Sequence, residues 1–139
     1  MTYGVFGNDI VVRLNIGEEI LQSLTQVITE QNITCASISG IGACDQVDVC
    51  IYNVSEKKYY PNHYNKPMEM ISLCGNATTM DGKPYLHLHA VFADETGAAV
   101  GGHLKQGDIC ATAELIIHKI AANVDRFYHP ETGLNLLQL

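Results

Sequence analysis

The sequence predicts a single α+β domain in which a largely antiparallel or mixed sheet of seven to eight strands packs on one main helix. Only one stretch, from Gly17 to about Gln31, carries apolar residues at helical spacing. Most of the remaining chain alternates apolar and polar residues between short turn segments, which is typical of strands. With 139 residues, 47% of them hydrophobic and 17% charged, residues 1–139 are long enough for one domain with a buried core.

The first expected elements are a strand over residues 9–15 and the helix that follows it. Every second residue of the strand faces inward, namely Ile10, Val12 and Leu14. The helix presents one apolar stripe, made of Ile20, Leu21, Leu24, Val27 and Ile28. We expect Glu18 and Glu19 in its first turn, where the helix dipole favours negative charge, and Asn32 at its end.

After the helix we expect only strands and turns. Strands are predicted at residues 33–39, 46–53, 68–75 and 109–118. Breaks or turns are predicted at residues 40–43, 78–84 and 106–108, which contain glycine. The tyrosine-rich segment 59–67 should be partly exposed. The tail, residues 126–139, is polar and then apolar, and we expect it to dock on its own sheet or on a neighbouring subunit.

Three histidines lie on a predicted hairpin. His87 and His89 alternate with Leu88 and share one strand face, and the segment Asp94–Ala98 reads as a short loop. A loop centred there places His103 directly opposite His89, with His87 on the diagonal. Opposed Cβ atoms are about 5 Å apart and diagonal ones about 7 Å apart.

Three imidazoles at this spacing can close on one zinc ion, with Zn–N distances near 2 Å and a fourth position left open. Gly101 and Gly102 precede His103 and allow close packing or a bulge beside the site. The alternative is that the histidines are surface residues or hydrogen-bond neighbouring tyrosines, and a single His-x-His pair would favour that alternative.

Three further residues are candidates for chemistry. Glu114 lies in the apolar run 109–117, where a carboxylate is costly unless it is paired or bound. It is a candidate metal ligand, a partner that orients a histidine, or an acid–base group, unless it faces solvent. Asn76 is a candidate ligand contact or a turn former. Arg13 is a candidate anion contact or part of a surface ion pair.

Composition excludes some classes of function. The formal net charge is −7, and Lys57–Lys58 is the only basic pair, which argues against strong duplex binding and against a membrane-surface helix. No apolar run reaches the roughly 18 residues of a membrane span, and the first residues lack a signal-peptide pattern, so we expect a cytoplasmic protein. The five cysteines contain no Cys-x-x-Cys and are expected to be reduced thiols.

Eight short motifs, in this order, resemble the Plants and Prokaryotes Conserved (PPC, also PCC) domain family. They are Gly17–Leu21, Ile38–Ala43, Ile71–Asn76, Asp81–Pro84, Leu86–Ala90, Gly101–Leu104, Thr112–Glu114 and Gly133–Leu137. The resemblance covers nearly the whole chain. It implies a homotrimer and, in stand-alone bacterial and archaeal members, a three-histidine pattern associated with bound zinc, here His87, His89 and His103.

The resemblance leaves three roles open. The first is a trimeric zinc-binding domain with a small-ligand site or hydrolytic or lyase chemistry, with Glu114 as the nearest acid–base group. The second is a DNA-binding regulator, because many prokaryotic members are labelled predicted DNA-binding proteins. In plant members an AT-hook contacts DNA, and this chain has none. The third is an assembly module in which the histidines only hold strands together.

Overall fold

The computed structural model describes all residues, 1–139, as eight strands and one helix. In chain order the elements are β1 (Thr2–Phe6), β2 (Asp9–Asn15), α1 (Ile20–Glu30), β3 (Ala36–Asn53), β4 (Lys58–Met80), β5 (Lys83–Ala93), β6 (Ala99–Lys119), β7 (Asp125–His129) and β8 (Leu134–Gln138). The predicted α+β class is confirmed. The single helix has 11 residues, and no helix is long and apolar enough to span a membrane.

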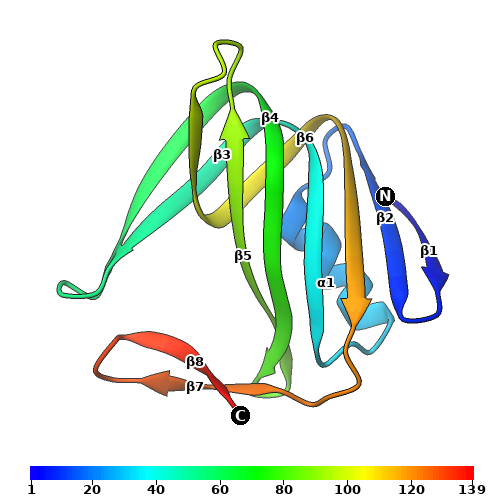
Figure 1. The fold of residues 1–139 in the computed structure, drawn as a ribbon, viewed down its shortest axis with the longest axis vertical. Helices are drawn as coiled ribbons and strands as arrows, with labels where there is room; N and C mark the ends of the chain where they lie inside the picture. Colours follow the sequence, from blue (N-terminus) through cyan, green and yellow to red (C-terminus); the bar gives the residue numbers. More distant parts are fainter.

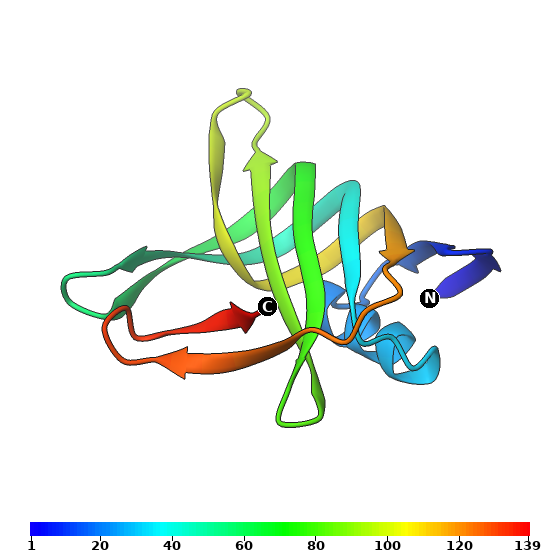
Figure 2. The same cartoon turned by 60° about the horizontal axis from the view of Figure 1, so that its bottom comes forward.

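Six strands form one antiparallel sheet in the order β1-β2-β6-β3-β4-β5. Strand β5 also pairs with the first part of β6, so β3, β4, β5 and β6 close on themselves while β1 and β2 extend from β6. The sheet is strongly curved as a result (Figure 1). The two tail strands, β7 and β8, form a separate hairpin (Figure 2).

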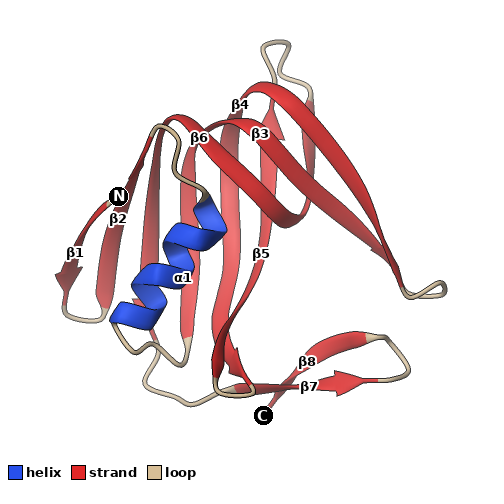
Figure 3. Cartoon of the chain, turned by 180° about the vertical axis from the view of Figure 1, so that it is seen from behind, coloured by secondary structure: helices blue, strands red, loops and turns tan.

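Helix α1 covers one face of the sheet (Figure 3). Its stripe is buried as predicted, with Ile20, Leu24, Val27 and Ile28 fully inaccessible and Leu21 partly buried. The prediction that Glu18 and Glu19 lie in the first turn was wrong. Glu19 is the N-cap, and its carboxylate accepts a hydrogen bond from the Gln22 N–H. Asn32 has a φ of 50°, a left-handed conformation that ends the helix where expected.

Two predicted interruptions, at residues 40–43 and 106–108, are not turns. Strands β3 and β6 run through them. The β3–β4 register shifts between Gly40 and Gly42, and the β3–β6 register shifts on either side of Cys44. Such irregularities bend a strand without ending it, so glycine marks curvature here. The turn expected over 78–84 is shorter, because β4 continues to Met80 and β5 begins at Lys83. The tyrosine-rich residues 59–67 belong to β4, and β1 was not predicted.

The tail hairpin packs against its own chain. The hydroxyl of Tyr52 donates to the Thr132 carbonyl at 2.7 Å, and Lys57 Nζ donates to the Pro130 carbonyl at 2.7 Å. Both contacts join the turn of the β7–β8 hairpin to the projecting end of the β3–β4 hairpin. The two hairpins therefore contact each other, and both lie beside β5 and β6.

Candidate metal centre

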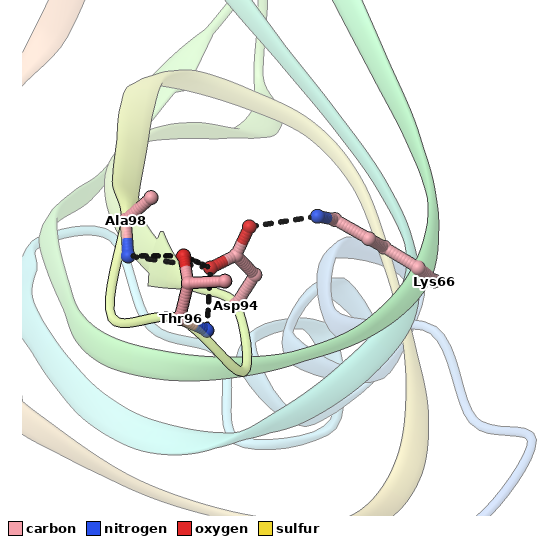
Figure 4. Close-up of polar contacts among 4 residues, drawn as sticks. All are labelled: Lys66, Asp94, Thr96 and Ala98. Atoms are coloured by element: carbon pink, nitrogen blue, oxygen red, sulfur yellow. Dashed lines mark hydrogen bonds and ion pairs between the residues drawn. The ribbon is translucent and has the colours of Figure 1, made fainter.

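The β5–β6 turn sets the register of the histidines. The Asp94 carboxylate accepts hydrogen bonds from the Thr96 N–H at 3.0 Å, the Thr96 hydroxyl at 2.6 Å and the Ala98 N–H at 3.2 Å (Figure 4). Gly97 completes the turn with a φ of 80°. This turn pairs His89 with His103, the register predicted from the sequence.

The two glycines before His103 allow strands to approach closely. A Cβ on Gly102 would lie 2.6 Å from the Cys50 carbonyl oxygen, and one on Gly101 would lie 2.8 Å from the Ala90 carbonyl oxygen. Any larger residue would push β6 away from β3 or β5. The glycines therefore fix the position of His103 against both neighbouring strands.

The structure brings His87, His89 and His103 together. Their ring centroids are 5.2 Å apart for His87–His89, 5.3 Å for His87–His103 and 5.6 Å for His89–His103. One nitrogen from each ring lies within 4.8 Å of the others, so the group can hold a metal ion. Nδ1 of His103 is buried and has no hydrogen-bond partner, the only such side-chain nitrogen or oxygen in the chain.

The surroundings favour neutral imidazoles. Burial lowers the pKa of His103 to about 4, with a further contribution from the positive charge of Lys105. Burial also lowers the pKa of His87, followed by the charge of Arg126. A histidine must be neutral to bind a metal, so these two rings are ready for ligation at neutral pH.

The histidines lie in a pocket of about 630 Å³. The β3–β4 hairpin contributes Ile51 and Tyr59, and the tail hairpin contributes an apolar wall of Leu134, Leu136 and Leu137. The Tyr59 ring lies 5.4 Å from the His103 ring, and burial raises the pKa of its hydroxyl. No Asp or Glu lines this pocket, although the chain carries 15 of them.

Arg126, at the start of the tail hairpin, is a pocket residue that the sequence analysis missed. It is 7% exposed, and its guanidinium lies 4.6 Å from the centre of the Tyr85 ring. It donates hydrogen bonds to Thr78 Oγ1, to Asn76 Oδ1 and to the Asn135 carbonyl, each at 2.8 Å. The available signal for this hairpin was the Pro130–Gly133 turn segment between the aromatic residues Phe127 and Tyr128 and the leucines of residues 134–137.

The other predicted site residues divide into two groups. Asn76 lines the same pocket and lies directly opposite His87 in the β4–β5 pair. Glu114 and Arg13 lie opposite each other on β6 and β2, are exposed, and do not line the histidine pocket. The structure therefore does not place Glu114 beside the histidines as the nearest acid–base group. Its side chain is exposed on β6, at a part of the curved sheet that does not line the pocket.

Several solved structures are similar to this chain. A candidate DNA-binding protein from Bacteroides thetaiotaomicron has 30% identity and a TM-score of 0.96, over 99% of this chain and 96% of that chain. A metal-containing protein from Archaeoglobus fulgidus has 28% identity and a TM-score of 0.88, over 99% and 97%. A plant- and prokaryote-conserved (PPC) protein from Pyrococcus horikoshii has 26% identity and a TM-score of 0.88, over 99% and 95%.

A search among curated proteins finds no match. Residues 1–121 match the Plants and Prokaryotes Conserved (PCC) domain. This segment contains the main sheet, the helix and all three histidines of the pocket, and it ends before the tail hairpin. The chain thus belongs to the Plants and Prokaryotes Conserved domain family.

Proposed function

We propose that this domain binds a zinc ion through His87, His89 and His103 and offers the open side of that ion to a small ligand in the pocket. The observation that carries the proposal is the convergence of three imidazole nitrogens within 4.8 Å. The unpartnered, buried Nδ1 of His103 adds support, because a buried polar atom is costly unless something binds it. The similar metal-containing protein from Archaeoglobus fulgidus is consistent with this role.

The donor set fits zinc. Imidazole is a preferred ligand of zinc, and three histidines with an open fourth position form a familiar catalytic arrangement. When bound, zinc supplies a Lewis acid that polarises an oxygen atom of a ligand. The chain itself supplies two half-buried rings, a pocket without carboxylates and a partly apolar wall.

Metal analysis of purified variants tests the proposal. We expect the unmodified protein to hold about one zinc per chain and His87→Ala, His89→Ala and His103→Ala each to lose most of it. His63→Ala is the matched control, because His63 is exposed on β4 and pairs with Asp48. Zinc content that is unchanged in all three pocket variants would refute the site.

We also propose that the protein assembles as a homotrimer through the face of the sheet that points away from the core. Five apolar side chains on five strands are each 40–55% exposed there, namely Val11, Ile41, Ile71, Val91 and Ile116. Successive side chains of a strand point to opposite faces of the sheet. Each of these residues stands next to a buried residue in its strand, except Ile41, which stands between two glycines, so these side chains point outward. An apolar surface that spans several strands is typical of an interaction site.

Sedimentation equilibrium tests the assembly. We expect a mass of about 46 kDa, three times the chain mass of 15.2 kDa, and dissociation when Ile116→Lys is introduced. Val54→Lys is the control, because Val54 is also an exposed apolar residue, at 56%, but lies on the β3–β4 turn. A monomeric unmodified protein would contradict the proposal.

DNA binding is the second candidate function, favoured by the description of the Bacteroides thetaiotaomicron relative. The net charge of −7 opposes it, since sequence-independent affinity for duplex DNA arises from Lys and Arg contacts with phosphates. A salt titration of binding to mixed-sequence duplexes tests this second function. Retention that weakens steeply with salt would support this function, and no retention even at low salt would remove it.

A further inference from the structure

The side chain of Arg126 is a buried cation without a carboxylate partner. It takes part in none of the four ion pairs of the structure, and it is 7% exposed. A guanidinium has five N–H groups, and protein acceptors account for three of them. Its neighbours are these neutral acceptors and the Tyr85 ring, so no protein group carries the opposite charge. Buried charges in proteins are usually paired, and an anion here would supply both the charge and the missing acceptors.

The location of Arg126 decides where that anion would lie. The side chain lines the histidine pocket, and its Asn76 partner lies directly across the strand pair from His87. Cross-strand neighbours of this kind have Cβ atoms about 5 Å apart. A ligand held by Arg126 would therefore lie beside the histidines, in a pocket that no acidic side chain lines.

We propose that the pocket takes a small organic monocarboxylate, whose carboxylate binds Arg126 while its short apolar chain packs on the tail hairpin. The planar guanidinium fork matches a carboxylate, and the leucines at 134, 136 and 137 supply the apolar contact. This inference rests on the proposed function, because the same pocket would hold the zinc ion. Arg126 also lies beyond residues 1–121, which match the family.

Nuclear magnetic resonance of the arginine side chains tests the inference in the unmodified protein. Arg13 and Arg126 are the only arginines, so the Nε–Hε spectrum has two signals. Butyrate should shift the Arg126 signal and leave that of Arg13 unchanged. The titration is run on zinc-loaded protein of measured metal content and on chelator-treated protein, and the shift is expected in both.

The outcomes separate the two proposals. If the unmodified protein takes up no zinc when zinc is added, the metal site is refuted, and a butyrate shift of Arg126 in that same protein still supports the carboxylate site. Zinc-loaded protein without a shift at about 100 mM butyrate refutes the carboxylate site alone. A shift caused equally by butanol or butylammonium, or by phosphate but not butyrate, also overturns it.

Variants give a second readout. Arg126→Gln should weaken butyrate affinity about tenfold or more, because the charge-assisted hydrogen bonds are lost, and Arg126→Lys should retain part of the affinity. Arg13→Gln is the matched control and should bind butyrate like the unmodified protein. Equal affinity in Arg126→Gln and Arg13→Gln contradicts the proposal.

Discussion

Arg126 Nη2 donates a hydrogen bond of 2.8 Å to Oδ1 of Asn76, and this bond joins residues 50 positions apart in the chain. Asn76 in turn pairs with His87 across β4 and β5. The tail hairpin is thereby fixed to the strand next to the histidines. The main sheet alone therefore does not complete the pocket, since the tail hairpin supplies one of its walls.

The first prediction concerns this attachment. Arg126→Gln should lower the free energy of unfolding by about 1–3 kcal/mol, because buried hydrogen bonds from a charged group are lost. Hydrogen exchange should accelerate in β7 and β8 before the main sheet, since two of the bonds attach the hairpin to Thr78 and Asn76 on β4 and the third joins β7 to Asn135 on β8. Arg13→Gln, on an exposed position, should change stability by no more than about 0.5 kcal/mol. Unchanged exchange in the tail would contradict the role assigned to Arg126.

The same attachment shows how far sequence reasoning reaches. The histidine cluster was predictable because it is local: alternation fixes the faces of β5, and a short loop from Asp94 to Ala98 fixes the register of β6. Arg126 was not, because its partners Asn76 and Thr78 are 50 and 48 residues away. Nothing in the tail itself indicates which distant strand it meets.

Glycine explains the main errors of the predicted fold. At Gly40 and Gly107 the sequence suggests breaks, yet β3 and β6 continue through both positions. A Cβ at Gly40 would lie 2.9 Å from the Glu114 carbonyl oxygen on β6, so the close approach of the two strands requires glycine there. Close approach and turn formation select the same residue, and a single sequence does not separate them.

The second prediction concerns metal removal. Free zinc at 100 times its dissociation constant should stabilise the fold by about 2.7 kcal/mol, which corresponds to a rise of roughly 8 °C in Tm for a domain of this size. A chelator should abolish this rise, and zinc added afterwards should restore it, as measured by thermal melting. His103→Ala should melt at one temperature with or without zinc. A chelator-sensitive Tm in that variant would show that the zinc responsible lies elsewhere.

The third prediction concerns the glycine before His103. Gly102→Ala should destabilise the protein by about 1–3 kcal/mol, because the new methyl group would lie 2.6 Å from the Cys50 carbonyl oxygen and force β6 from β3. The displaced His103 should bind zinc about tenfold more weakly, measured by competition with a chelator of known affinity. Ala99→Ser adds one atom at an exposed position of the same strand and is the control. Normal zinc affinity in Gly102→Ala would mean that the strand spacing does not position the ring.

The fourth prediction concerns pH and the β5–β6 turn. The Lys66 ammonium, which lies 2.8 Å from the Asp94 carboxylate, and the hydroxyl of Thr96 hold the pKa of Asp94 well below its usual range. The pKa of Asp in an unfolded chain is about 3.9, so the unfolded chain binds this proton at a higher pH than the folded one. The stability contributed by Asp94 is therefore present above that pH and is lost as the pH falls towards the folded pKa.

Asp94→Asn consequently should unfold at lower urea than the unmodified protein at pH 7, and the difference should shrink as the pH falls below about 4. Glu95→Gln, in the same loop, is the control, because Glu95 forms no hydrogen bond or ion pair with Lys66. Its difference from the unmodified protein should not follow this pH dependence. Because the turn fixes the pairing of His89 with His103, Asp94→Asn should also weaken zinc binding at pH 7. A carboxylate with a lowered pKa requires that the difference in urea midpoint between Asp94→Asn and the unmodified protein shrink as the pH falls. A difference that grows instead would show that the Asp94 carboxylate does not stabilise this turn.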